Sequence, residues 1–285
     1  MPLITEYTFQ LGDTGIVLND DAASIPFVDI DRVTGLDSPT FRETMRDHEG
    51  VDGGFIDAEF ETGREIFLEG TAYCQAGLEE VYMDQLKFNY APVRTSIPFY
   101  LKAPSVDERV IFVKSRGVSY DWSTLRRIGM TRIQFKMFAE DPRLYDNFLQ
   151  EYIIPFGGEI GTGLGFSFGF PFGFGATVLP NGLTITNVGN RSTPAILTIQ
   201  GPVVNPQIIN DTLSRRLGFV ITLGALDTLV VDLGNRTVNL NGNVNRRNTM
   251  STAEWFLISS GDSFIRFGGA SGTGTMTVTF RNAWR

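Results

Sequence analysis

One stretch limits what this 285-residue chain can fold into: residues 156–175, which read FGGEIGTGLGFSFGFPFGFG. Eight glycines and six phenylalanines occupy these twenty positions. Every second position holds a ring from Phe166 onward, at Phe166, Phe168, Phe170, Phe172 and Phe174. A helix would scatter these rings around its circumference, whereas an extended chain places all five on one side. The sequence therefore predicts an extended segment with a row of rings about 26 Å long, at roughly 3.3 Å per residue.

These five rings, here called the Phe row, need cover, because burying one Phe contributes roughly 1.5–3 kcal/mol and an exposed row invites aggregation. Three kinds of cover remain open. The segment docks back on its own chain as a linker, another subunit covers it, or it is a membrane-active loop, since viral fusion segments are also rich in Gly and Phe. No membrane span is expected, because the glycines and prolines disfavour a helix and backbone in lipid must be hydrogen-bonded internally. The Phe row is thus our candidate oligomer interface.

The composition changes at the same place in the chain. Residues 1–155 carry 15 Lys and Arg against 26 Asp and Glu, a net charge of −11, while residues 156–285 carry 9 against 6, a net charge of +3. We therefore predict an N-terminal domain over 1–155, a linker or interface segment over 156–179 and a C-terminal domain over 180–285. The acidic first half argues against specific nucleic-acid binding, which needs a basic face, and suggests a surface that repels DNA.

The first half reads as strands with one or two short helices. Alternating residues predict strands over 3–9 and 15–18, a hairpin of 55–60 with 64–73 around Thr62-Gly63, and strands over 97–102, 109–116 and 130–139. A helix is predicted over 78–88, with Leu78, Val81, Tyr82, Gln85 and Leu86 on its apolar side. Asp141 followed by Pro142 predicts a second short helix, ending at about Leu149. The expected fold is an α+β sandwich.

The second half reads as strands alone. Strand patterns recur every 8–12 residues, over 183–188, 195–201, 206–210, 218–223, 227–233, 236–242, 254–259, 263–269 and 274–282. Turn residues such as Gly201-Pro202 and Asn241-Gly242 separate them. Many short strands at even spacing without a helical window predict a two-sheet sandwich or jelly roll, so the whole chain is expected to be mainly β.

Residues that could carry chemistry are few. His48 is the only histidine and Cys74 the only cysteine, so a catalytic triad, a zinc site and an internal disulfide are not expected. Asp29, Asp31 and Asp37 lack the Gly and the terminal Glu of a calcium loop. The first residues have neither the basic start nor the apolar core of a signal peptide, which fits synthesis in a reducing cytoplasm. We expect no catalytic residue, no cofactor and no metal.

Two stretches resemble the distal tail protein (Dit) of long-tailed, non-contractile bacteriophages. The first runs from LRRIG at 125–129 to AEDPRLY at 139–145, where Asp-Pro-Arg-x-Tyr closes a β domain. The second is an ordered set of motifs, namely NVGN at 187–190, PAILTIQGP at 194–202, NP at 205–206, LVVD at 229–232, RTVNLNG at 236–242, EWFL at 254–257 and GDSFIRF at 261–267. The resemblance covers most of residues 54–285. The Phe row is not a hallmark of that family.

The resemblance implies a structural protein of the virion tail tip and not an enzyme. In that family the N-terminal domains form a ring, usually a homohexamer, that stacks on the tail tube protein and lets DNA pass during genome ejection. The next tip protein, which carries fibres or a lysin, docks below for host attachment. The C-terminal domain is a galectin-like β-sandwich that projects outward, and in some members it holds a receptor-binding protein or a host saccharide.

Two other functions stay open from the residues themselves. A carbohydrate-binding module would use Trp255 and Trp284 as platforms, although Trp255 lies in the apolar run WFLI and fits a core position better. A glycan-degrading enzyme would need a pair of catalytic carboxylates, and adjacent acids such as Glu79-Glu80 are more typical of a solvated surface.

Overall fold

The computed structural model describes residues 7–13, 16–20, 25–37, 40–47, 52, 54–104, 106–121, 128–157 and 182–285. The chain divides into two compact units, one comprising Met1–Asn147 with Arg285 and the other Phe148–Trp284. The first unit thus ends before the predicted boundary at residue 155, because β11 (Gln150–Pro155) pairs along its length with β24 (Thr275–Phe280) of the second unit. The predicted Phe row and the remainder of 158–181 lie outside the described residues. The prediction of a mainly β chain is confirmed.

The first unit is built on one antiparallel strand path that folds back at its long central strand, β8 (Val106–Tyr120). The path runs β2-β1-β7-β8-β9-β6-β3, and β10 pairs with β8. The bounds are β1 Thr8–Leu11, β2 Val17–Leu18, β3 Phe27–Thr34, β6 Arg64–Tyr73, β7 Ile97–Ala103, β9 Met130–Ala139 and β10 Leu144–Asp146. Residues of β8 up to Val113 pair with β7, and those from Lys114 pair with β9. One strand therefore belongs to both halves of the sheet.

The core of the first unit lies between these halves and α1 (Glu79–Asn89). The predicted helix is confirmed, but its predicted apolar side is confirmed only for Tyr82 and Leu86. Tyr82, Met83 and Leu86 are buried, whereas Leu78 is 50% and Val81 67% exposed. Apolar side chains occupy most of the circumference of this helix, so periodicity alone does not select the buried side. Burial raises the pKa of Tyr82 to about 12.

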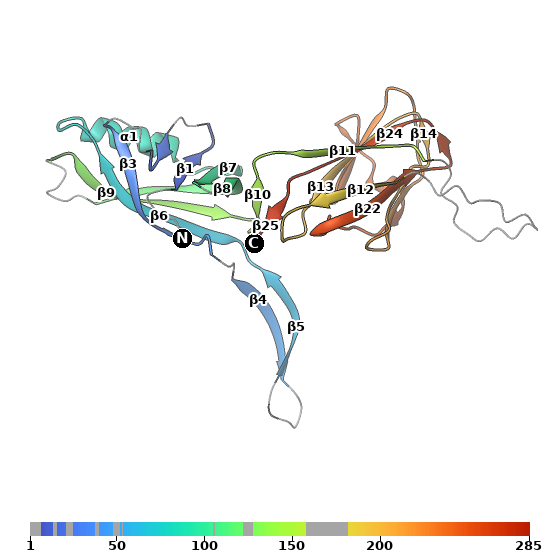
Figure 1. The fold of residues 1–285 in the computed structure, drawn as a ribbon, viewed down its shortest axis with the longest axis horizontal. Helices are drawn as coiled ribbons and strands as arrows, with labels where there is room; N and C mark the ends of the chain where they lie inside the picture. The colour runs from blue at the N-terminus through green and yellow to red at the C-terminus, as the bar shows by residue number, and fades with distance from the viewer. Residues whose placement is uncertain are drawn as a thin grey trace, which may run out of the picture. The chain divides into compact units, whose positions relative to one another are not determined.

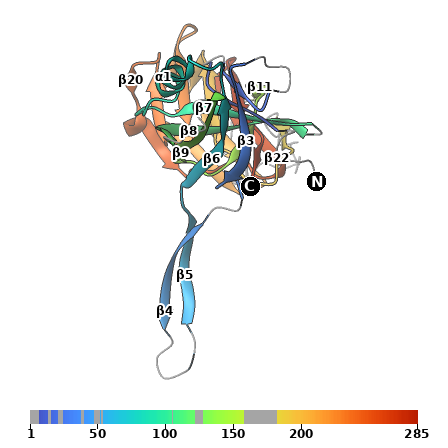
Figure 2. The same ribbon diagram turned by 90° about the vertical axis from the view of Figure 1, so that its left-hand side faces the viewer.

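The predicted hairpin of 55–60 with 64–73 is wrong. Instead, β5 (Gly54–Glu61) pairs with β4 (Phe41–Asp47), while β6 pairs with β3 and β9. The alternating pattern identifies both runs as strands, but a pattern does not choose the partner of a strand. The β4–β5 hairpin is a separate two-stranded sheet with no third strand among the described residues. Both views of the ribbon show it projecting from the rest of the first unit (Figures 1 and 2).

The predicted helix from Asp141 to Leu149 is also wrong, because this segment contains β10. The Asp141 carboxylate accepts hydrogen bonds from nearby groups of an extended chain instead of capping a helix. The strands predicted over 97–102, 109–116 and 130–139 are confirmed, and 130–139 has the bounds of β9 itself.

The second unit is a sandwich of two antiparallel sheets. One has the order β11-β24-β13-β18-β19-β20, the other β12-β22-β15-β16-β21, and a small sheet has the order β17-β14-β23. The remaining bounds are β12 Gly182–Asn187, β13 Ala195–Gln200, β14 Val203–Val204, β15 Gln207–Asn210, β16 Arg215–Phe219, β17 Thr222–Leu223, β18 Thr228–Asp232, β19 Thr237–Leu240, β20 Val244–Asn245, β21 Met250–Ala253, β22 Gly261–Gly268, β23 Ser271–Gly272 and β25 Ala283–Trp284. The two-sheet prediction for this half is thereby confirmed.

One predicted strand of the second unit is absent, over 254–259. This segment follows β21 as irregular chain, and Ile258 makes an isolated bridge to Thr193. Phe256 and Ile258 are nevertheless buried in the core between the two sheets. Their apolar character therefore reflects burial in the core and not membership of a sheet. Among the described residues, no helix is both long and apolar enough to cross a membrane.

Replacing Gly70 with Ala tests the packing of β3 on β6. An added Cβ would lie 2.0 Å from the Asp29 carbonyl oxygen on β3. We expect Gly70→Ala to lower the free energy of unfolding of the first unit by about 1–3 kcal/mol, because the two strands must separate. Hydrogen exchange of peptides from β3 and β6 in the full chain measures this. The control is Gly12→Ala, whose Cβ meets nothing within 4 Å and whose positive φ costs about 1 kcal/mol. Equal losses in the two variants would contradict the prediction.

Candidate functional site

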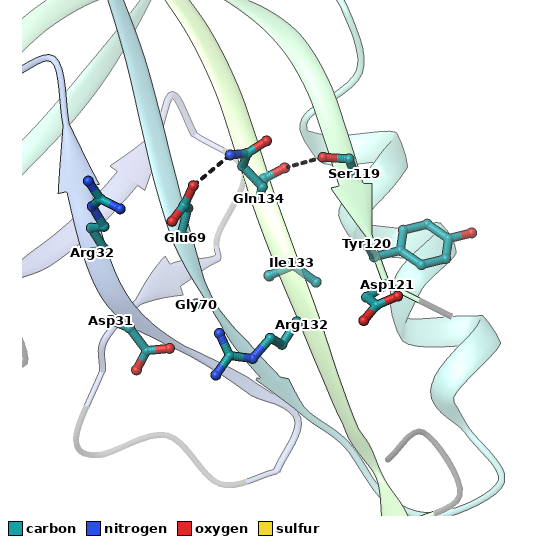
Figure 3. A pocket seen from close by; sticks show the side chains of 10 residues that line it. All are labelled: Asp31, Arg32, Glu69, Gly70, Ser119, Tyr120, Asp121, Arg132, Ile133 and Gln134. Carbon is teal, nitrogen blue, oxygen red and sulfur yellow. Dashed lines mark hydrogen bonds between the residues drawn. The ribbon is translucent and has the colours of Figure 1, made fainter. Parts of the chain in front are cut away.

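The outer sheet face, defined here as the outward side chains of β3, β6, β9 and the second half of β8, is a broad surface of the first unit with many polar side chains. A shallow hollow of about 610 Å³ lies on it. Its lining, drawn in Figure 3, consists of Asp31, Arg32, Glu69, Gly70, Ser119, Tyr120, Asp121, Arg132, Ile133 and Gln134. Alternation along β6 and β9 produces this face, since every second residue is buried in the core.

The lining of this hollow carries both signs of charge, with one more carboxylate than guanidinium group. Arg32 lies opposite Glu69 across β3 and β6, and the Gln134 side-chain amide donates to the Glu69 carboxylate at 2.7 Å. Figure 3 shows the side chains of Asp31 and Arg132 directed toward one another. Two arginines thus face three carboxylates, and the acidic excess of the first half is not concentrated here. No set of three or more His, Cys, Asp or Glu side chains suited to a metal ion occurs among the described residues.

A second hollow of about 510 Å³ continues the same face. It is lined by Glu65, Phe67, Arg116, Lys136, Met137 and Phe138. The Arg116 guanidinium carbon lies 5.7 Å from the centre of the Phe138 ring, so this aromatic side chain is partly covered by a cation. In the described part of the chain, none of the large apolar side chains that are strongly exposed lies on the outer sheet face. The face is suited to contact with water and not to a dry interface.

The base of the β4–β5 hairpin is held firmly. Arg64, which is only 4% exposed, donates through Nη1 to the carbonyl oxygens of Leu36 at 3.0 Å and Asp37 at 2.6 Å. The Thr62 backbone N–H donates to the Thr40 carbonyl at 2.9 Å, and the two hydroxyl oxygens are 2.6 Å apart. Burial lowers the pKa of Arg64, and the nearby Glu61 carboxylate opposes this shift. These contacts join the chain on both sides of the hairpin to the first unit.

The hairpin and α1 both expose large apolar side chains. Phe60 on β5 is 57% exposed and Phe41 on β4 is 37% exposed. On α1, Val81 is 67% and Phe88 82% exposed. A strongly exposed Phe in a regular helix is unusual for a surface that remains in water. Sequence reasoning missed these positions because it assigned Val81 to the core, although the surplus of apolar residues in this helix was a usable signal.

The Asp-Pro-Arg-x-Tyr motif at 141–145 forms a compact network at the end of the first unit. The Asp141 carboxylate accepts the Arg143 backbone N–H at 3.1 Å and the Tyr145 hydroxyl at 2.5 Å. The Arg143 guanidinium lies 3.3 Å from the same carboxylate. Burial, followed by the Asp141 charge, raises the pKa of Tyr145 above its ordinary value. The motif therefore fixes a turn and carries no catalytic geometry.

The NVGN motif at 187–190 closes the second unit around buried amides. The Asn187 side chain donates to the Arg191 carbonyl at 2.7 Å and accepts the Gly189 N–H at 3.0 Å. The Asn282 side chain accepts the Val188 N–H at 3.1 Å. A Cβ on Gly189 would lie 2.0 Å from the Ala283 carbonyl oxygen, so only glycine fits there. The motif is explained by backbone hydrogen bonding and close packing.

The remaining candidate residues are the Phe row, His48 and two tryptophans. The Phe row (Phe166, Phe168, Phe170, Phe172 and Phe174) and His48 fall outside the described residues. Trp255 is half-buried against the core of the second unit, and the Arg247 guanidinium carbon lies 5.8 Å from its ring centre. Trp284 is half-buried on β25. Sugar binding by these two tryptophans stays a prediction.

Comparison with known proteins links the chain to phage tails. Residues 188–284 match the family model described as siphovirus-type tail component, C-terminal domain. The structure resembles the crystal structure of SPP1 Dit (gp 19.1), described as a paradigm of hub adsorption apparatus in phages infecting Gram-positive bacteria, with 13% identity, 98% of this chain and 99% of that chain covered, and a TM-score of 0.64. It also resembles a chain of the phage P2 baseplate in its activated conformation with Ca, with 10% identity, 96% and 98% covered, and a TM-score of 0.52.

No curated protein sequence matches the chain. The predicted resemblance to the siphovirus distal tail proteins is confirmed by the family match and the first structural likeness together. At these identities the structural likeness establishes the fold, and the family model concerns the second unit alone.

Removing the Asp141 charge tests the network that ends the first unit. We expect Asp141→Asn to lower the free energy of unfolding of the first unit by about 1–3 kcal/mol, because buried donors lose a charged acceptor. Tyr145→Phe should cost less, and the double variant should cost less than the sum of the two. Hydrogen exchange of peptides from β9 and β10 in the full chain measures the effect. Asp84→Asn, on the exposed side of α1, is the matched control and should change little; additive losses in the double variant would contradict the network.

Proposed function

We propose that this chain is a structural hub of a phage tail tip, in which several copies form a ring between the tail tube and the tip proteins. The family match of the second unit supports a tail component, and the likeness to SPP1 Dit supports the fold of a hub. The observation that carries self-assembly is the β4–β5 hairpin, which stands alone as a two-stranded sheet. The role is structural, and no residue is assigned to catalysis.

An isolated hairpin needs a partner for physical reasons. Two strands alone are marginally stable in water, and both edges of such a pair leave backbone groups without strand partners. Phe60 adds an exposed ring to this surface. In a ring, the neighbouring copy is always close enough to cover the exposed hairpin. Identical subunits that contact one another head-to-tail form a closed ring when the rotation between neighbours allows it. Six subunits is the number that the family resemblance implies.

The outer sheet face is the part of the first unit that we assign to the channel for DNA. Its polar lining, with three carboxylates and two guanidinium groups, and its lack of strongly exposed apolar side chains suit a surface that stays wet after assembly. Exposed apolar side chains lie elsewhere, among them those on α1 and on the hairpin, where contacts between proteins would bury them. Carboxylates such as Asp31 and Glu69 would reduce adhesion of the DNA backbone by like-charge repulsion.

The partners proposed for the ring are the tail tube protein on one side and a tip protein carrying fibres or a lysin on the other. The second unit is proposed to be a galectin-like outer domain that contacts a receptor-binding protein or a host saccharide. The place of action is the virion tail tip, after synthesis in the host cytoplasm.

The solution mass of the purified chain tests the ring. Light scattering, with negative-stain images of the same sample, is expected to give several times the mass of one chain and particles with a central hole. Particles without a hole, or a single-chain mass at every concentration up to the millimolar range, would contradict a ring that forms without other tail proteins.

Neutralising the channel carboxylates tests the DNA path. Virions that carry Asp31→Asn with Glu69→Gln are expected to eject DNA several-fold more slowly, because like-charge repulsion of the DNA backbone is reduced. Ring mass should be unchanged, because both substitutions preserve side-chain volume. Asp107→Asn, at an exposed position of β8 in the same unit, is the matched control. Ejection at the wild-type rate in the double variant would refute the assignment of this face to the channel.

A further inference from the structure

We infer that the outer face of α1 receives the β4–β5 hairpin of a second copy of this chain, with Phe60 and Arg42 as the contacting pair. This inference rests on the proposed ring and assigns the surfaces that would hold it together. It follows from two exposed surfaces of the first unit that are complementary in both apolar character and charge.

The outer face of α1 is an apolar patch in an acidic setting. Leu78, Val81 and Phe88 are 50%, 67% and 82% exposed, and their spacing places them along one side of the helix. Glu80 and Asp84 lie on this exposed side between the apolar residues. Because large apolar side chains in a regular helix mark contact sites, this face is expected to be covered in the assembled protein.

The helix has more acidic than basic side chains. Lys87 lies 2.9 Å from the Asp84 carboxylate and also 4.9 Å from the centre of the Tyr120 ring, so this one cation is shared between two neighbours. The helix carries Glu79, Glu80 and Asp84 against Lys87 alone. A partner that buries Val81 and Phe88 and also supplies a cation would fit this face better than a purely apolar one.

One face of the hairpin has those properties. Arg42 and Phe60 are directly opposite one another across β4 and β5, so their side chains lie on the same face. Both residues are exposed, and the Arg42 guanidinium carbon lies 5.7 Å from the centre of the Phe60 ring. The pair presents an apolar ring with a positive charge beside it. Stacking on the ring also limits the motion of the arginine, which reduces the entropy lost on docking.

The outer face of α1 and the hairpin of the same copy cannot contact one another. Both views show α1 and the β4–β5 hairpin at opposite ends of the first unit (Figures 1 and 2). A contact between them must therefore join different copies. Because each copy offers one of each surface, the contact is head-to-tail, which is the kind that produces rings.

Hydrogen bonds at the base of the β4–β5 hairpin hold it in place before docking. The Arg64 hydrogen bonds to Leu36 and Asp37, and the Thr40–Thr62 pair, hold its strands at a fixed start. A projecting element that is held at its base loses less conformational entropy when it docks.

The test compares ring mass among variants of the full chain. Phe88→Ser is expected to raise the concentration for half-assembly about tenfold or more, because a buried ring is lost from each contact. Arg42→Glu should weaken assembly similarly, and adding Glu80→Arg to Arg42→Glu should restore it in part, because the charges are exchanged. Leu226→Ser, at a residue of the second unit that is 94% exposed, is the matched control and should assemble like the wild type.

Covalent trapping gives a second readout. The variant with Val81→Cys and Phe60→Cys is expected to form disulfide-linked multimers, whereas each single-Cys variant should not extend beyond dimers. The native Cys74 is buried and so adds little background. One outcome would refute the helix–hairpin contact and leave the ring in place. In that outcome the wild type forms rings, Phe88→Ser and Arg42→Glu assemble like the wild type, and the cysteine pair gives no disulfide-linked multimers. If the wild type itself never assembles, a ring that forms without other tail proteins and this contact are both overturned.

Discussion

The first unit depends on a corner in β8, where one strand changes from one sheet partner to another. The register shifts between Ser115 and Gly117, and Gly117 has a φ of +105°, a conformation that suits glycine. The buried Ser115 hydroxyl donates to the Tyr90 carbonyl at 2.6 Å, and the Ser115 carbonyl accepts the Val93 N–H at 3.2 Å. The corner therefore fixes the end of α1 to the sheet as well as folding the sheet on itself. The core, the helix position and the outer sheet face all follow from this one bend.

This arrangement separates the surfaces of the first unit by character. The strands on one side of the corner turn their alternate polar side chains outward and form the outer sheet face. Exposed apolar side chains lie on other elements, among them α1 and the hairpin. The face that we propose for solvent contact and the surfaces that we propose for contact between proteins thus belong to different elements of one small domain.

The sequence predicted strands well and their partners poorly. Alternation in β9 was strong enough to give its bounds, because one side of it is buried at every second residue. The pairing of β5 with β4 was missed, because β4 has mixed composition and the turn signal Asp52-Gly53 before β5 was not read as the connection between the two strands. The sequence Asp141-Pro142 indicates a helix start by local preference, yet the Tyr145 hydroxyl and the Arg143 N–H hold the same carboxylate in a turn. Here one local pattern competes with another: the side-chain hydrogen bonds within residues 141–145 hold a turn where Asp141-Pro142 alone would start a helix.

Geometry leaves little choice of residue at some positions of the second unit. Gly189 has no room for a Cβ against the Ala283 carbonyl. The Asn187 side-chain amide donates to the Arg191 carbonyl and accepts the N–H groups of Gly189 and Ala283. The buried Thr193 hydroxyl donates to the Arg281 carbonyl at 2.7 Å in the same region. Such positions constrain residue identity, whereas a β core accepts Val, Ile, Leu or Phe at most sites. A fold that fixes residue identity at few positions can be shared by chains of low identity, as in the likeness to SPP1 Dit at 13%.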